Sequence, residues 1–141
     1  MKSQEIGLGG YEVQNIKTTH HNEIKARFDL RPKHCIRCGS GQLVSKGPYT
    51  RSVRHLDGFG FASLLHIQLR RWQCKECHRC FVPELPGIRP WHHSTEPYRR
   101  KIYQDHQDGI CASTLSKRES LGHATIGRIY EEFTYLQAQE R

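Results

Sequence analysis

The sequence is poor in the residues that build a large apolar interior. Apolar residues make up 35% of the 141-residue chain, and no run of eighteen apolar residues occurs. The missing run excludes a membrane-spanning helix, and the low apolar share excludes one large hydrophobic core. No secretory signal is visible after Met1, and the chain holds neither an internal repeat nor a low-complexity tract. We therefore expect one or two small domains in a soluble, cytoplasmic protein.

Four of the six cysteines form two matched pairs. Two residues separate Cys35 from Cys38, and two residues separate Cys74 from Cys77. Together the pairs supply four thiolates, which is the tetrahedral donor set of a structural zinc site. We therefore predict that these four cysteines bind structural Zn²⁺ and hold a small domain together.

The spacing leaves other interpretations of these cysteines open. Disulfides suit secreted proteins, and a redox dithiol needs only one such pair. Zinc and the iron of a rubredoxin-like site share this spacing. Cys80 lies three residues after Cys77 and could replace it as the fourth ligand. The sixth cysteine, Cys111, is expected to be a small packed side chain in a helical stretch.

The net charge of +8 is unevenly distributed. Residues 31–93 contain eleven Lys or Arg and three acidic residues, whereas the stretches before and after each sum to zero. Four thiolates on one Zn²⁺ would cancel about two of these positive charges. A basic module of this kind suits a polyanion, and nucleic acid is the usual one. We expect double-stranded DNA as the partner.

Strand signals surround the two cysteine pairs. Residues 11–17 and 23–30 are expected to be extended, and residues 65–70 alternate cleanly and lead into the second pair. Between them, residues 42–45 and 50–56 are expected to form two strands broken at Gly47-Pro48. The pattern predicts a small antiparallel β zinc ribbon at residues 31–82 that follows an N-terminal β extension at residues 1–30.

Four arginines of the ribbon are candidate DNA contacts. They are expected to stand on or beside the exposed strand faces, where they would bind phosphates. A proline-rich linker follows at residues 83–94, with Trp91 expected to anchor it on the ribbon. The four arginines are Arg51, Arg54, Arg70 and Arg71.

The last third of the chain has helical character. Residues 95–106, 112–120 and 123–136 are expected to form three helices, and the apolar spacing of the last two is typical of a helix-turn-helix. The predicted fold class is therefore α+β, with the zinc ribbon followed by a three-helix helix-turn-helix domain at residues 95–141.

The start of the third helix would enter the major groove. On this interpretation His123, Ala124, Gly127 and Arg128 face the bases, and Thr125 lies near a phosphate. Arg128 could bind a guanine through two hydrogen bonds.

An ion pair on the same helix is the alternative role for Arg128, with Glu131 or Glu132 as its partner. Two positions depart from the usual helix-turn-helix pattern. Glu119 stands where an apolar core residue is usual, and Ser120 stands where a turn glycine is usual.

The order of these motifs resembles the N-terminal region of bacterial insertion-sequence transposases of the ISL-three type. That resemblance implies a zinc ribbon and a helix-turn-helix that bind the terminal inverted repeats, followed in the family by an RNase H-like domain with a DDE triad. The motifs are Cys35-x2-Cys38-Gly39-Ser40, Arg51-x2-Arg54-x2-Asp57 and Arg70-Arg71-Trp72-x-Cys74-x2-Cys77-x3-Phe81-x2-Glu84.

Three functional hypotheses follow. The first is the DNA-binding region of such a transposase, without a catalytic site, because the chain stops at Arg141, about where the family's catalytic domain would begin. The second is a stand-alone zinc-dependent transcriptional regulator. The third is an enzyme, for which the two leftover thiols have no evident base partner. We expect a nucleoid-associated bacterial protein. The spacing of Tyr130, Phe133 and Leu136 could support a homodimer, with packing within the chain as the favoured alternative.

Overall fold

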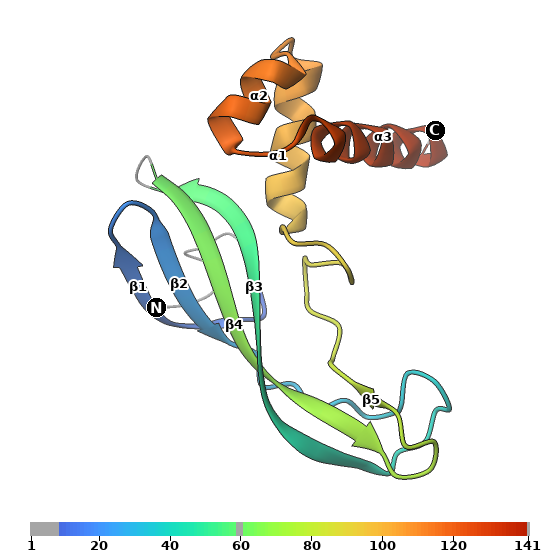
Figure 1. Cartoon of the computed structure of the whole chain (residues 1–141). Helices are drawn as coiled ribbons and strands as arrows, with labels where there is room; N and C mark the ends of the chain where they lie inside the picture. The colour runs from blue at the N-terminus through green and yellow to red at the C-terminus, as the bar shows by residue number, and fades with distance from the viewer. Residues whose placement is uncertain (1–8, 59–60, 141) are drawn as a thin grey trace. The chain divides into compact units, whose positions relative to one another are not determined.

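This computed structural model describes residues 9–58 and 61–140, with the backbone alone for Glu140. The chain divides into two compact units, Met1–Thr95 and Glu96–Arg141. Within the described residues, the first unit holds a five-stranded sheet and the second holds three helices (Figure 1). The fold class is α+β, as predicted. Residues 1–8 of the expected N-terminal extension, and Arg141, lie outside the described residues.

The sheet as a whole is mixed and not purely antiparallel, because β2 of the N-terminal extension pairs parallel with β4, whereas β3, β4 and β5 of the predicted ribbon pair antiparallel. Its strand order is β1-β2-β4-β3, with β5 beside β4. All neighbours are antiparallel except β2 and β4, because the chain runs out along β3 before it returns along β4. The first hairpin thus joins the same sheet as the ribbon. The strands are β1 (Glu12–Thr18), β2 (Asn22–Arg27), β3 (Leu43–Gly58), β4 (Phe61–Cys74) and β5 (Cys80–Phe81).

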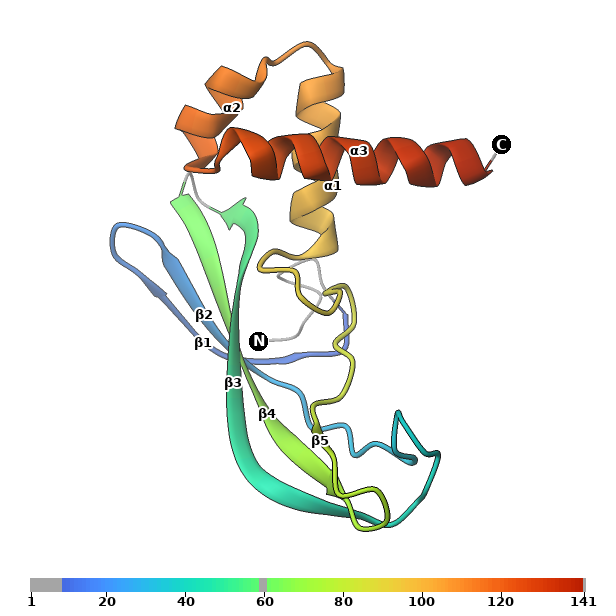
Figure 2. The same cartoon turned by 45° about the vertical axis from the view of Figure 1, so that its right-hand side comes forward.

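The long strand β3 corrects a second expectation. We predicted two strands broken at Gly47-Pro48, but β3 continues through this dipeptide and pairs with β4 on both sides of it. The register shifts between Ser45 and Pro48, which forms a bulge. Pro48 has no N–H to donate, and Gly47 adopts a φ of 107°, so the bulge absorbs both residues without ending the strand. Figure 2 shows the two strands curving together toward β5.

The buried face of β4 changes sides along the strand. Odd-numbered residues from Leu65 to Leu69 are buried, whereas Trp72 and Cys74 are the buried residues beyond them. Arg70 and Arg71 are both exposed and stand at the switch, opposite the β3 bulge. One strand therefore supplies two apolar clusters, one in the sheet and one at the cysteines.

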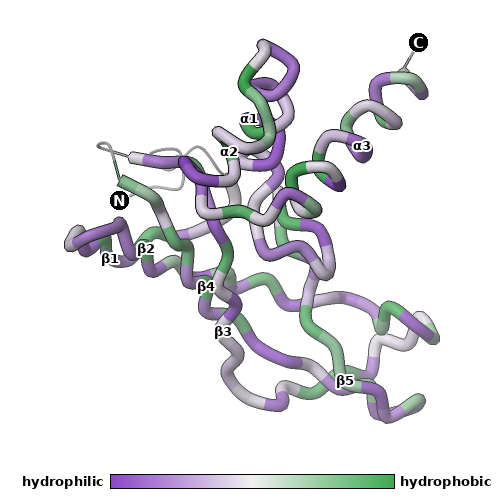
Figure 3. Tube along the Cα trace, turned by 45° about the horizontal axis from the view of Figure 1, so that its top comes forward, coloured by the Kyte–Doolittle hydropathy of each residue, from purple (hydrophilic) through white to green (hydrophobic). Residues whose placement is uncertain are grey.

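Hydrophobic and hydrophilic residues alternate along β2 and β4, as the tube in Figure 3 shows. This alternation buries one face of the sheet, and the segment after β5 supplies further apolar residues to the same cluster. Trp91 is not the anchor that we expected, because its side chain is 92% exposed. Leu85 and Ile88 are buried in the sheet core instead. The sheet core consists of Tyr11, Val13, Ile24, Ala26, Phe28, Val53, Leu65, Ile67, Leu69, Leu85 and Ile88.

The helical unit contains α1 (Glu96–Gln107), α2 (Ala112–Glu119) and α3 (His123–Glu140). Apolar residues of all three helices are buried, with Ile102 on α1 and Leu115 on α2. Ser120 ends α2 in the left-handed conformation at φ 56°, the geometry that a turn glycine adopts readily. The buried apolar residues of this unit are Tyr98, Ile102, Tyr103, Leu115, Ile126, Ile129 and Phe133.

The sixth cysteine is not a packed side chain, so that expectation was wrong. Cys111 precedes α2 and is exposed, with its Sγ 3.2 Å from Thr114 Oγ1.

None of the helices in the described part of the chain combines the length and the apolar character that a bilayer crossing requires.

Candidate metal centre and nucleic-acid interface

The two cysteine pairs converge on one point. The Sγ atoms of Cys35, Cys38, Cys74 and Cys77 all lie within 4.8 Å of one another. Two of the cross-pair distances are 3.6 Å, from Cys35 to Cys77, and 3.4 Å, from Cys38 to Cys74. Tetrahedral zinc with Zn–S bonds of about 2.3 Å requires sulfurs about 3.8 Å apart. The four thiols therefore fit a closed tetrathiolate site.

The two cysteine pairs sit in two separate backbone turns of the same kind. Cys35 N donates to Ser40 O at 2.7 Å, and Gly39 N donates to Cys35 O at 3.0 Å. In the second turn Cys74 N donates to Arg79 O, and His78 N donates to Cys74 O, both at 3.0 Å. Both turns place the residue after the second cysteine at positive φ, 76° for glycine in the first and 61° for histidine in the second.

Backbone N–H groups in these turns also point at sulfur. Arg37 N lies 3.4 Å from Cys35 Sγ, and Cys77 N lies 3.5 Å from Cys74 Sγ. Hydrogen bonds of this kind stabilise a thiolate, so N–H groups of the first turn, those of Cys38 and Arg37, lower the pKa of Cys35 to about 6. The N–H of Cys77 lowers the pKa of Cys74 in the same way.

The pKa of the other thiol of each pair is shifted in the opposite direction. The Ser40 N–H lowers the pKa of Cys38, but the neighbouring sulfurs, Cys74 first, and burial outweigh it and raise that pKa to about 12. Burial and the neighbouring sulfurs likewise outweigh the Arg79 N–H and raise the pKa of Cys77. Each pair thus combines one thiol of lowered pKa with one of raised pKa, and a metal that binds all four sulfurs displaces the protons that the thiols still carry.

An apolar layer closes the inner side of the cysteine cluster. Cys35 and Cys74 are buried beside Leu43 and Trp72, with Phe81 packed against them. Cys80, the alternative ligand, is exposed on β5 and is not part of the sulfur cluster. The arrangement has no open ligand position among the described thiols, which is the form of a structural site.

Comparison with known families identifies this region. Residues 31–77 match the zinc-finger of transposase IS204/IS1001/IS1096/IS1165, the ISL3 zinc ribbon. This part of the chain is similar to a transposase zinc finger. The match and the four-thiol cluster together support structural Zn²⁺ at these cysteines and a transposase-related DNA-binding region. No curated protein and no solved structure matches the chain.

The ribbon arginines fall into two groups. Arg51 and Arg54 are half-buried on β3. Arg51 Nη2 donates to two main-chain carbonyls, Arg89 O at 3.1 Å and His92 O at 2.6 Å, and so ties the segment after β5 to the strand. Arg54 Nη2 lies 3.0 Å from Asp57 Oδ1.

Arg70 and Arg71 are the exposed group. Arg70 Nη1 lies 3.3 Å from Ser45 Oγ, and the Arg71 guanidinium stands 5.3 Å from the centre of the Tyr49 ring. Each guanidinium carries five N–H donors, so these contacts leave most of its donors for a ligand. The exposed pair is therefore better placed than Arg51 and Arg54 to reach an anion.

The predicted base-contacting residues share the start of α3. His123, Ala124, Gly127 and Arg128 are exposed, and Thr125 is half-buried. Arg128 Nη2 donates to Thr125 Oγ1 at 3.2 Å. The alternative partner Glu132 binds a different arginine, Arg99 on α1, at 2.9 Å.

Glu119 is a site that sequence reasoning noticed but did not explain. Its side chain lies in the core of the helical unit with a residue exposure of 3%. Tyr98 donates to Glu119 Oε2 at 3.2 Å, and Arg118 Nε and Lys101 Nζ lie 3.5 and 3.9 Å from Oε1. The signal in the sequence was an acidic residue at a position where the helix-turn-helix pattern usually has an apolar one. The Tyr98 hydroxyl that donates to this carboxylate belongs to a residue 21 positions away.

Proposed function

We propose that this chain is the sequence-specific DNA-binding region of an insertion-sequence transposase and that it recognises terminal inverted repeats. The match of residues 31–77 to a transposase zinc finger carries the proposal. In this scheme the chain is bacterial and nucleoid-associated, and its zinc is structural. The finer division at residues 1–30, 31–82, 83–94 and 95–141 is part of the same proposal.

The sheet unit is proposed to supply sequence-independent affinity. The charge excess of +8 lies wholly in residues 31–93. Phosphate contacts by Lys and Arg release counterions and therefore make binding salt-dependent. Arg70 and Arg71 are the main candidates, because Arg51 and Arg54 already hold main-chain or carboxylate oxygens and would contribute less.

The helical unit is proposed to supply sequence recognition. Its α2 and α3 flank the left-handed Ser120, and the exposed start of α3 carries Arg128 for a guanine. Glu132 would repel phosphates, but Arg99 binds its carboxylate at 2.9 Å and offsets that charge. These features support α2 and α3 as a helix-turn-helix.

The homodimer hypothesis loses part of its sequence support. Within the helical unit the Tyr103 ring packs against Tyr130 in a tilted arrangement and stacks on Phe133, with ring centres 5.3 and 5.4 Å apart. The spacing that suggested a second copy is therefore used for packing inside the chain. A homodimer stays a hypothesis that sedimentation of the zinc-loaded protein would test.

Genome-fragment capture tests the proposed function. The zinc-loaded chain is mixed with sheared DNA of its source, and the retained fragments are sequenced. Recovery of inverted repeats that flank a mobile element is the expected result. Recovery of promoter sites without such repeats would instead support a stand-alone regulator. An Arg128→Ala protein serves as the matched control, because it should retain DNA without enriching the repeats.

A further inference from the structure

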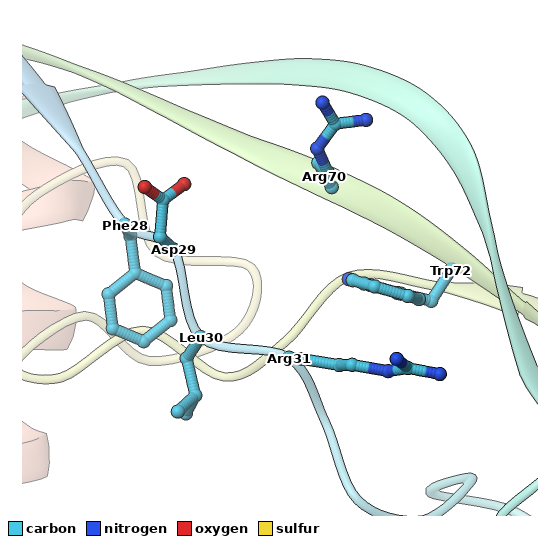
Figure 4. Close-up of a pocket in the computed structure, with 6 residues that line it drawn as sticks. All are labelled: Phe28, Asp29, Leu30, Arg31, Arg70 and Trp72. Atoms are coloured by element: carbon cyan, nitrogen blue, oxygen red, sulfur yellow. The ribbon is translucent and has the colours of Figure 1, made fainter.

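A recess lies beside the zinc-ribbon strands, next to the segment that joins β2 to the first cysteine pair. Its volume is about 190 Å³, which is below the range for drug-sized ligands, so only a small group would fit. Figure 4 shows its lining side chains around a common space. The lining residues are Phe28, Asp29, Leu30, Arg31, Arg70 and Trp72.

The indole N–H of Trp72 is the most informative group in this recess. Trp72 is only 9% exposed, and its Nε1 is buried without a hydrogen-bond partner among the described residues. Figure 4 shows this nitrogen facing into the space between Phe28 and Arg70. A buried donor without an acceptor is unfavourable, so a ligand that brings an acceptor to it gains a hydrogen bond.

The remaining walls offer apolar surface and both signs of charge. Leu30 is 61% exposed although it borders the recess. The Arg31 guanidinium lies 5.5 Å from the centre of the Trp72 ring, and Arg70 Nη1 donates to Ser45 Oγ at 3.3 Å. Asp29 pairs with Arg27 at 2.7 Å and keeps acceptor capacity on its carboxylate.

This combination favours one class of ligand. A phosphate alone could bind the two arginines, but it would gain nothing from the apolar walls and would face the Asp29 carboxylate. A nucleobase has apolar faces, acceptors for the indole N–H, N–H donors for the carboxylate and an attached phosphate for the arginines. We propose that the recess binds a nucleobase that has left the stack of the DNA held by the zinc ribbon. This inference rests on the proposed DNA-binding function.

Fluorescence of Trp72 tests the proposal directly. The chain has two tryptophans, so a Trp91→Phe protein reports Trp72 alone. The zinc-loaded protein is titrated with equal-length probes: a paired duplex, that duplex with one unpaired base, a single strand, and the duplex with an abasic residue at the unpaired position. Emission should change with the unpaired base and the single strand but not with the abasic probe. An equal change with the abasic probe would overturn the proposal, because phosphates alone would then explain it.

The single-strand and unpaired-base probes also distinguish the source of the base. A larger response to the unpaired base in a duplex assigns the recess to a base turned out of paired DNA, and a larger response to the single strand assigns it to an open strand. Both outcomes support the binding of a base in the recess. Failure of every probe to bind would overturn the DNA-binding function as well, whereas binding without base dependence would remove only this inference.

Paired variants locate the effect. Leu30→Ala and Trp72→Phe should each lower the preference for the unpaired-base probe over the abasic probe by about 3- to 10-fold in anisotropy titrations with labelled DNA. Leu30 is exposed, so its variant tests the recess even if the Trp72 variant folds poorly. Ile36→Ala is the control, because Ile36 is 67% exposed on the same unit and does not line the recess. Equal effects of Leu30→Ala and Ile36→Ala would contradict the proposal.

Discussion

The sheet unit and the helical unit close their small cores by different means. In the sheet unit, Leu43 and Trp72 pack beside the metal-binding sulfurs, so one cluster depends on an ion. In the helical unit, buried apolar residues such as Leu115 surround one carboxylate, Glu119. A metal-dependent core is lost in a single step, whereas an apolar core weakens one side chain at a time. This difference predicts which unit loses stability when a zinc ligand or a buried side chain is replaced.

Removal of a zinc ligand should have the largest effect, and that effect should be confined to the sheet unit. Cys74→Ser should abolish stoichiometric zinc binding and unfold the two cysteine turns with Leu43 and Trp72, because binding to a structural site contributes about 10 kcal/mol or more, while the separate apolar core of the sheet should persist. The helical circular dichroism signal should largely survive. Zinc analysis and circular dichroism measure both effects. Cys80→Ser is the matched control and should retain the metal; loss of zinc from that variant would mean that Cys80 is a ligand.

Truncation of the buried carboxylate should reach only the helical unit. Glu119→Ala leaves the Tyr98 hydroxyl without this acceptor and opens a cavity, so we expect a loss of about 2–3 kcal/mol in unfolding free energy. Glu119→Gln keeps an acceptor and should cost less. Chemical denaturation followed by helical circular dichroism gives the values. A parallel loss of zinc affinity would show that the two cores are coupled.

DNA binding should separate the units by function. Arg128→Ala should reduce discrimination between target and unrelated DNA by roughly 5- to 150-fold, the equivalent of about 1–3 kcal/mol. Replacement of Arg70 and Arg71 by alanine should weaken all sequences alike and lower the salt slope by about 2. Titrations at several salt concentrations measure both quantities. The reverse pattern would exchange the roles proposed for the two units.

Substitutions at the positive-φ positions of the two cysteine turns should have smaller effects than those above. Gly39 and His78 hold equivalent positions at positive φ, and a Cβ on Gly39 would meet no atom within 4 Å. Gly39→Ala should therefore cost about 1 kcal/mol through backbone strain alone, whereas His78→Gly should relieve similar strain. Competition with a chelator measures both as shifts in zinc affinity. Equal shifts in one direction would contradict the equivalence of the turns.

Local patterns predicted much of this molecule. Alternation in residues 65–70 identified β4, and apolar spacing placed the three helices within a few residues of their observed ends. The cysteine spacing predicted the cluster of four sulfurs. These features depend on neighbours in the sequence, and for that reason a sequence pattern can reveal them.

The missed features depend on distant partners. The parallel pairing of β2 with β4 joins Ile24 to Leu65, and no local pattern specifies that neighbour. The contacts of Arg51 with two carbonyls could not be read from the sequence, because these carbonyls belong to residues 38 and 41 positions away. Trp91 looked like an anchor because large apolar residues are usually buried, yet smaller residues before it fill the core.

Two adjacent arginines, Arg70 and Arg71, stand where the buried face of β4 changes sides, and they fix the spacing between the sheet core and the cysteine cluster. Loss of either Arg70 or Arg71 by deletion, rather than by substitution, would turn Trp72 and Cys74 to the opposite side of the strand. Two residues must therefore separate Leu69 from Trp72 for the sheet core and the cysteine cluster to keep their present faces of the strand. An insertion or deletion there would separate the metal from the sheet even if every ligand were retained.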